Sequence, residues 1–133
     1  MRQSFSRRID SLSAIFAFID RGIASLDVDA ETRFDLHFAA EELFTNIVKY
    51  RTESIRDVEI ELDCRSDLVR ITLIDVGVDP YDVTTGPDVR LDRPVEERAP
   101  GGLGLFLMRK VIDDLDYHYE DRVSRIVLTK RLR

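Results

Sequence analysis

Residues 58–76 read VEIELDCRSDLVRITLIDV and contain the clearest structural signal in the chain. From Val58 to Cys64, apolar residues alternate with acidic ones, a pattern typical of a half-buried strand. Ser66 and Asp67 then make a turn into Leu68 to Val76, which is more continuously apolar, as expected of a strand nearer the middle of a sheet. The stretch therefore predicts two consecutive strands that share one sheet.

Two amphipathic helices are expected before these strands. In the first, from Phe5 to Leu26, apolar residues recur at steps of four and three, which places them on one stripe. The second extends from about Ala30 to Tyr50, with Asp29 as its N-cap. We interpret both stripes as core, although the first would also serve as a surface for a partner helix or a second copy. The stripes consist of Phe5, Ile9, Leu12, Phe16, Ile19, Ile23 and Leu26 in the first helix and of Leu36, Ala40, Leu43 and Ile47 in the second.

The periodic pattern is lost from Gly77 to Gly101, where all four prolines of the chain fall. Unpatterned segments of this length inside a compact domain are usually functional lids or disordered. A third helix then begins at Gly101-Gly102-Leu103-Gly104 and continues to about Asp114, and strands follow at 117–120 and 124–132. The expected packed side of this helix is Leu103, Leu107, Val111 and Leu115. This order of elements predicts an α+β fold, a two-layer sandwich with a mixed or antiparallel sheet and helices on one face.

The composition indicates a single domain over residues 1–133, with a formal net charge of −6. Apolar residues make up 44% and charged residues 35%, enough for one core and a solvated surface. No apolar run reaches the roughly 20 residues of a membrane-spanning helix, and no signal-peptide core follows the N-terminus, so we expect a cytoplasmic protein without membrane contact. The single Cys64 excludes an internal disulfide, and the acidic balance disfavours direct nucleic-acid binding.

Polar side chains lie beside the apolar stripe of the second helix. Glu42 and Asn46 are four residues apart, so they share one helical face. A carboxylate in that place can orient or deprotonate a hydroxyl group, and a carboxamide oxygen can ligate Mg²⁺. The alternative is an ordinary solvated helix face.

Two glycine-containing segments are further candidates. Asp75-Val76-Gly77 places one acceptor and one flexible residue at the end of a strand, which suits the edge of a pocket but also an ordinary turn. Gly102 and Gly104 lie at the start of a helix, where free amide groups can hold phosphate; a glycine hinge is the alternative. Neither segment matches the phosphate loop of Walker-type enzymes or a dinucleotide fingerprint.

Taken in this order, these features resemble the ATP-binding domain shared by gyrase, heat-shock chaperone, histidine kinase and mismatch-repair ATPases. Within that superfamily the chain resembles the stand-alone anti-sigma-factor serine kinases, over about residues 7–133. The matching motifs are Glu42-x-x-x-Asn46 for the family's N box, Asp75-Val76-Gly77 for the first glycine box, and Gly102-Leu103-Gly104 for the second. The resemblance implies a Bergerat-type fold in which residues 77–101 form the ATP lid.

The resemblance also implies roles for single residues. Asn46 would bind Mg²⁺ that bridges the phosphates of ATP, and Glu42 would act as the catalytic base or orient the attacking hydroxyl. Asp75 would accept a hydrogen bond from the adenine amino group, and Gly77 would let the backbone pass close to the base. Positioning and charge stabilisation then suffice for phosphoryl transfer without a covalent protein intermediate.

For the phosphates, the resemblance implies backbone contacts from Gly102 and Gly104, and Arg98 could add a positive charge from the lid. Two departures from the family pattern stand out. Tyr50 occupies a place where many relatives have histidine. Asp79, near the position of a second glycine in the first glycine box, would direct negative charge toward a nucleotide.

We therefore expect an ATP- and Mg²⁺-dependent protein serine/threonine kinase that acts as an anti-sigma-factor regulator. Its expected partners are an anti-sigma-factor antagonist as substrate, an alternative sigma factor, and a second copy of the chain in a homodimer. The alternative is a non-catalytic regulatory module of the same fold that binds nucleotide or protein. The segment 77–81 is shorter than the family's usual first glycine box and lacks its second glycine, which favours this alternative.

Overall fold

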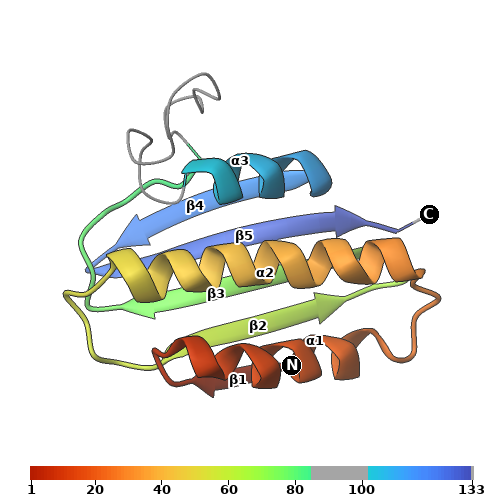
Figure 1. Cartoon of the computed structure of the whole chain (residues 1–133), viewed down its shortest axis with the longest axis horizontal. Coiled ribbons are helices and arrows are strands. Elements are labelled where there is room, and N and C mark those ends of the chain that lie inside the picture. Colours follow the sequence, from red (N-terminus) through yellow and green to blue (C-terminus); the bar gives the residue numbers. More distant parts are fainter. Residues whose placement is uncertain (85–101, 133) are drawn as a thin grey trace.

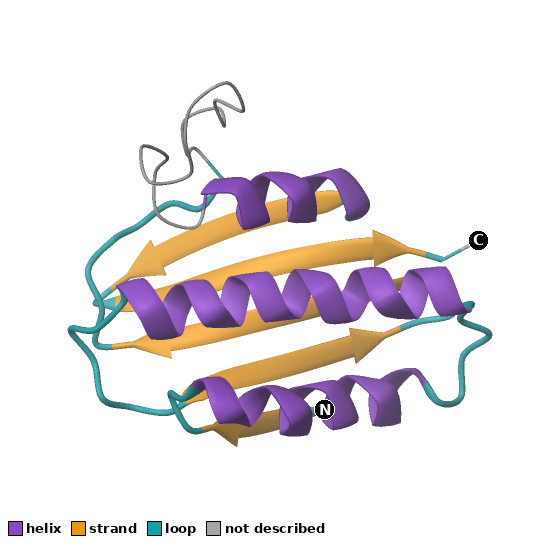
Figure 2. Cartoon of the chain, viewed as in Figure 1, coloured by secondary structure: helices purple, strands orange, loops and turns teal. Residues whose placement is uncertain are grey.

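The computed structural model describes residues 1–84 and 102–132. They form a five-stranded antiparallel sheet in the order β1-β2-β3-β5-β4, with the helices on one face (Figure 1, Figure 2). The strands are β1 (Arg2–Phe5), β2 (Val58–Cys64), β3 (Leu68–Val76), β4 (Asp114–Glu120) and β5 (Val123–Arg131). The helices are the 3-10 turn η1 (Ile9–Ser11), α1 (Leu12–Ile23), α2 (Ala30–Tyr50) and α3 (Gly102–Val111). The predicted α+β sandwich is thus confirmed, and the sheet is antiparallel throughout.

The centre of the chain folds as its pattern predicts. Helix α2 begins and ends at the expected residues, and the Asp29 side chain accepts a hydrogen bond from the amide of Thr32 at 2.7 Å. Strands β2 and β3 also have the expected bounds, and they pair antiparallel. The predicted stripe of α2 is buried against the sheet, with Leu36, Ala40, Leu43 and Ile47 all within 2% of complete burial.

The prediction of a helix from Phe5 was wrong. Phe5 ends strand β1 and pairs with Val58, and α1 begins only at Leu12. The chain is extended at Arg8, with φ −146° and ψ 145°, so the helical stripe cannot pass through this residue. Pairing with the edge of β2 satisfies backbone groups and buries Phe5 at the same time, which a spacing rule along the sequence does not detect.

The packed side of the third helix also differs from the prediction. Leu103 and Leu107 are exposed, at 37% and 45%, whereas Leu105 and Met108 are buried. Leu115 lies in β4, because α3 ends at Val111 and the chain turns directly into that strand. Helix α3 packs on α2, and this contact selects the buried side.

The topology brings four chain segments to one end of the sandwich. In Figure 1, the C-terminal end of α2, the end of β3, the start of β5 and the first turn of α3 lie at the same end of the molecule. Asn46, Asp75 and Ser124 come from three of these segments and line one pocket. None of the helices in the described residues is long and apolar enough to cross a membrane.

Candidate functional site

Asn46 has the side chain that points most directly to a ligand. It lies on α2, is only 5% exposed, and its Nδ2 has no hydrogen-bond partner among the described residues. A buried polar atom without a partner carries a desolvation penalty that a ligand or a water molecule can relieve. Asn46 and Asp75, both predicted as site residues, line the same pocket. Asn46 comes from α2 and Asp75 from β3.

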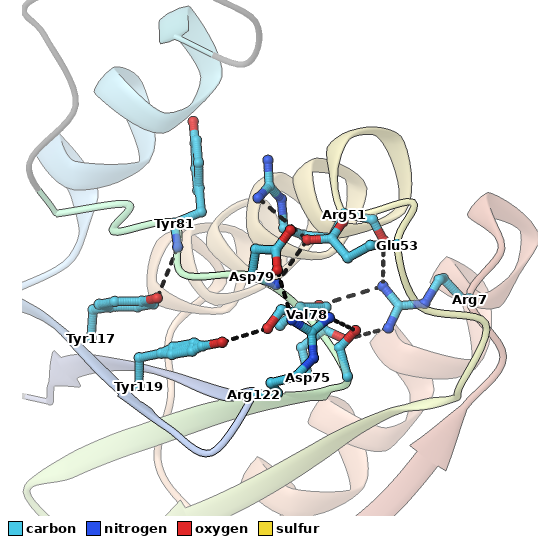
Figure 3. Close-up of polar contacts among 11 residues, drawn as sticks. Arg7, Arg51, Glu53, Asp75, Val78, Asp79, Tyr81, Tyr117, Tyr119 and Arg122 are labelled. Atoms are coloured by element: carbon cyan, nitrogen blue, oxygen red, sulfur yellow. Dashed lines mark hydrogen bonds and ion pairs between the residues drawn. The ribbon is translucent and has the colours of Figure 1, made fainter.

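Asp75 is buried at the end of β3 and paired with a residue that the sequence pattern did not identify. The Arg7 guanidinium contacts both carboxylate oxygens of Asp75, through Nη2 to Oδ1 and through Nη1 to Oδ2 (Figure 3). Burial raises the pKa of Asp75, and the hydrogen bonds and charge of Arg7 oppose this shift. The fork of an arginine suits a carboxylate in this two-bonded arrangement. The carboxylate thus already has a strong donor.

The same arginine also holds the loop that follows α2. Nη1 of Arg7 donates to the carbonyl oxygen of Arg51, and Nε donates to that of Arg56, both at 3.1 Å. The Arg7 side chain is 9% exposed and the Asp75 side chain 2%. Arg7 therefore joins the segment after β1, the loop after α2 and the end of β3.

The segment that leaves β3 is held by the β4–β5 hairpin. Gly77 has φ +81°, a conformation that side chains rarely adopt, and its amide donates to the carbonyl of Arg122 at 2.8 Å. The Tyr119 hydroxyl donates to the carbonyl of Val78 at 2.7 Å. These bonds direct Val78 inward, where it is completely buried.

The following residues are also held in place. The amide of Tyr81 donates to the Tyr117 hydroxyl at 2.9 Å, and the Arg51 guanidinium lies 4.2 Å from the centre of the Tyr81 ring. Arg51 Nε is buried and has no hydrogen-bond partner among the described residues. Val83 is buried too, so the first part of the predicted lid forms a wall of the pocket.

The negative charge of Asp79 is paired at the surface. Its carboxylate contacts Arg122 at 2.7 Å, and both side chains are more than half exposed. Its amide donates to the Glu53 carboxylate at 3.0 Å (Figure 3). The positive charge of Arg122 offsets the negative charge of Asp79. Asp79 therefore repels an anion less than the sequence suggested.

Glu42 and Gly104 form a close contact between α2 and α3. A Cβ atom on Gly104 would overlap the Glu42 carboxylate and lie 2.6 Å from its Cδ, so a larger residue here would push the flexible end of the Glu42 side chain aside. Burial and the neighbouring Glu41 raise the pKa of Glu42, while Lys49 lowers it. A carboxylate with a raised pKa binds a proton more tightly than one in water, which suits a proton acceptor.

The pocket between these residues is small as it stands. The cavity lined by Asn46, Asp75, Val78, Tyr81 and Val83, among others, has a free volume of about 10 Å³. That is room for about one water molecule, whereas sites for small molecules hold roughly 300–1,000 Å³. The Nδ2 donor of Asn46, which has no partner among the described residues, fits a phosphate oxygen, but the region around Asp75 would have to open to admit a purine.

The other predicted site residues take separate places. Gly102 begins α3, and Tyr50 ends α2 with 37% of its surface exposed. Arg98 and the remainder of the predicted lid, residues 85–101, lie outside the described residues. Arg7, Arg51 and Arg122 were missed as site residues, because each lies in a loop or turn and the sequence pattern suggested only solvated charge.

Known proteins resemble the chain over most of its length. Residues 5–130 match the family described as histidine kinase-like ATPase domain. The chain belongs to this family. Its curated relatives include the serine-protein kinase RsbW of Listeria monocytogenes, 33% identical over 109 residues, with 72% of this chain and 64% of that protein covered. The serine/threonine-protein kinase BtrW of Bordetella bronchiseptica is 32% identical over 102 residues, with 75% and 71% covered.

Solved structures support the fold. The RsbU and RsbW domains of Rv1364c from Mycobacterium tuberculosis align with a TM-score of 0.67 at 16% identity, covering 98% of this chain and 32% of that one. A histidine kinase domain from Erythrobacter litoralis aligns with a TM-score of 0.54 at 14% identity, covering 92% and 59%. The resemblance to the anti-sigma-factor serine kinases is thus confirmed at the level of the family. The chain spans just under two thirds of the length of the Listeria relative.

Proposed function

We propose that this protein is an ATP- and Mg²⁺-dependent protein serine/threonine kinase. The observation that carries the proposal is the Asn46 side chain, which is buried and whose Nδ2 has no partner within residues 1–84 and 102–132, one helical turn from a Glu42 carboxylate that meets Gly104. These residues belong to two helices, and all three come from the motifs that resemble the family's N box and second glycine box. The kinase names of two relatives of similar sequence support the same reading.

Asn46 would hold Mg²⁺ through its amide oxygen. Among residues 1–84 and 102–132, no three histidine, cysteine, aspartate or glutamate side chains are grouped closely enough to hold a metal ion. Mg²⁺ often uses few protein ligands and takes its other oxygens from substrate phosphates and water, so one amide suits it. When bound, ATP would supply the phosphoryl group, and Mg²⁺ would neutralise charge on the phosphate oxygens.

Glu42 would receive or orient the proton of the hydroxyl that is to be phosphorylated. Its position is set by α2 on one side and by Gly104 of α3 on the other. Its raised pKa makes it a better proton acceptor than a solvated carboxylate. Backbone amides at Gly102 and Gly104 would face the phosphates, where the start of a helix favours negative charge.

Asp75 and Gly77 would form the adenine end of the site. Asp75 would accept a hydrogen bond from the adenine amino group, and the absence of a side chain at Gly77 would leave room for the base beside the backbone. This assignment requires the segment 78–83 to move, since the pocket has a free volume of only about 10 Å³.

The substrate we propose is an anti-sigma-factor antagonist, phosphorylated on serine or threonine in the cytoplasm. A sigma factor would be the alternative partner, and the protein would act as a homodimer in regulating transcription. The relatives named serine-protein kinase support the serine or threonine acceptor. A pull-down from the native cytoplasm, with and without Mg²⁺-ATP, identifies these partners and shows whether nucleotide changes the choice between them.

A phosphotransfer assay tests the activity. Purified protein, radiolabelled ATP, Mg²⁺ and the captured antagonist should give labelled serine or threonine, and Asn46→Ala and Glu42→Gln should abolish the label. Glu41→Gln is the matched control, because it makes the same change at the adjacent residue and should leave transfer intact. Absence of transfer from the wild-type protein to its captured partner would refute the proposed activity.

A non-catalytic regulatory module is the second candidate, and the Arg7–Asp75 pair and the small pocket favour it. A thermal-unfolding assay with Mg²⁺-ATP separates the two. A ligand that binds only the folded state adds about 2.7 kcal/mol at one hundred times its dissociation constant. Stabilisation without transfer would leave a nucleotide-binding module, and no stabilisation at millimolar ATP would leave a protein-binding one.

A further inference from the structure

Arg7 places a positive charge on the Asp75 carboxylate, the group that the proposed function assigns to binding the adenine amino group. Arg7 lies between β1 and η1, and it reaches Asp75 from the side opposite Tyr117 and Tyr119 in Figure 3. Both oxygens of Asp75 receive a bond from the guanidinium, and both side chains are at least nine-tenths buried. A hydrogen-bond donor of a ligand can reach the Asp75 carboxylate only if it displaces Arg7 or shares the carboxylate with it.

We propose that Arg7 competes with the nucleotide base for Asp75 and thereby sets the affinity of the site for ATP. This inference rests on the proposed function. In the arrangement described, Arg7 occupies the Asp75 carboxylate, and ATP binds to the fraction of molecules in which Arg7 has left Asp75 and residues 78–83 have moved. Only the adenine end is affected, because Asn46 and Glu42 make no contact with Arg7 among the described hydrogen bonds and ion pairs.

Arg7 also couples the base end to the N-terminal segment. Its guanidinium bonds to the carbonyls of Arg51 and Arg56 would be lost together with the bond to Asp75. The turn that presents Arg7 is closed by two backbone bonds, from the amide of Arg8 to Ser6 at 2.8 Å and from the amide of Ser11 to Arg8 at 3.0 Å. Nucleotide binding should therefore loosen this turn, although ligands usually protect the protein around them.

Calorimetric titration with Mg²⁺-ATP tests the competition. If the Arg7-free form is at most a tenth of the molecules, Arg7→Met should tighten ATP binding by about tenfold or more, because the apparent dissociation constant is the intrinsic one divided by the competent fraction. Arg8→Met is the matched control: Arg8 is exposed, its side chain bonds only to Asp10 among the described residues, and binding should equal that of the wild type. Equal or weaker binding by Arg7→Met would overturn the inference.

A second measurement does not depend on any variant folding. In the wild-type protein, saturating Mg²⁺-ATP should speed hydrogen exchange at the amides of Arg8 and Ser11 severalfold. Unchanged or slower exchange at these amides, with ATP bound, would overturn the competition even if Arg7→Met could not be purified.

The possible failures are distinguishable. If the wild-type protein binds ATP and Arg7 has neither effect, the competition is refuted and the proposed kinase function stands. If neither the wild type nor Arg7→Met binds ATP, both the competition and the proposed function are refuted. If Arg7→Met binds ATP where the wild type does not, the competition is supported in its strongest form.

Discussion

The Glu42 carboxylate occupies the space that a Cβ atom on Gly104 would need. This contact joins α2 to α3 at the site, and a side chain at position 104 would displace the end of Glu42, whereas glycine, otherwise unfavourable inside a helix, leaves it in place. Replacing Gly104 should therefore have two opposite effects: it should raise the stability of helix α3 and lower phosphotransfer, because Glu42 is displaced.

We expect Gly104→Ala to lose at least tenfold in phosphotransfer while its stability changes little. Alanine adds up to about 1 kcal/mol of helix propensity over glycine, which offsets the shift forced on the flexible end of Glu42. Urea unfolding and the transfer assay measure the two effects separately. Full activity in Gly104→Ala would show that the position of Glu42 is unimportant.

Gly22→Ala provides the contrasting case. A Cβ on Gly22 would lie 2.7 Å from Cδ1 of Leu62 and 3.2 Å from Sγ of Cys64, both within the packing of α1 against β2. Overpacking of this kind costs about 1–3 kcal/mol, and we expect that loss in urea unfolding with transfer unchanged at temperatures where the variant is folded. Equal stability of Gly22→Ala and wild type would contradict the packing.

The buried Arg7–Asp75 pair should be important for stability. Removing one partner of a buried ion pair costs about 3–5 kcal/mol, because the other charge is left without a partner in a poorly solvated place. We expect this loss for Arg7→Met in urea unfolding, and less than about 0.5 kcal/mol for Arg8→Met at the exposed neighbouring position. A loss for Arg7→Met no larger than for Arg8→Met would mean that the pair does not persist in solution.

The raised pKa of Glu42 predicts a pH dependence of stability. The unfolded chain releases the Glu42 proton at a lower pH than the folded chain does, so folding is favoured below the unfolded pKa, near 4.3, and this advantage is lost as pH rises through the folded pKa. Glu42→Gln cannot titrate. Its stability relative to wild type should therefore be constant at low pH, increase above about pH 4.3 and level off beyond the folded pKa. A difference that is independent of pH would contradict the raised pKa.

The Tyr119 hydroxyl should hold the segment after β3 in its inward position. Tyr119→Phe removes the bond to the Val78 carbonyl, at a cost of about 0.5–1.5 kcal/mol. We expect faster hydrogen exchange over residues 77–83 in this variant and unchanged exchange in α1. If exchange over residues 77–83 is the same as in wild type, the segment is held by its apolar packing alone.

The first and third helices show where sequence patterns fail. The steps from Phe5 through Ile9 to Leu12 match a helix, yet Phe5 is buried by pairing with Val58 in a distant strand. In α3, both Leu103 and Leu105 are apolar, and only the packing of α3 on α2 buries Leu105 instead of Leu103. Periodicity identifies an apolar stripe, but it does not tell which neighbour covers it.

Local pattern alone was sufficient for α2, β2, β3 and the face shared by Glu42 and Asn46, because backbone hydrogen bonding and one-sided burial repeat at fixed short intervals. The tertiary structure decided that Arg7 reaches Asp75, 68 positions away, and that Glu42 meets Gly104. These contacts depend on strand order and on helix packing, which join residues whose separation in the sequence carries no period. The sequence therefore predicted Glu42, Asn46 and Asp75 as candidate residues, whereas the pairing of Asp75 with Arg7 was decided by the tertiary structure alone.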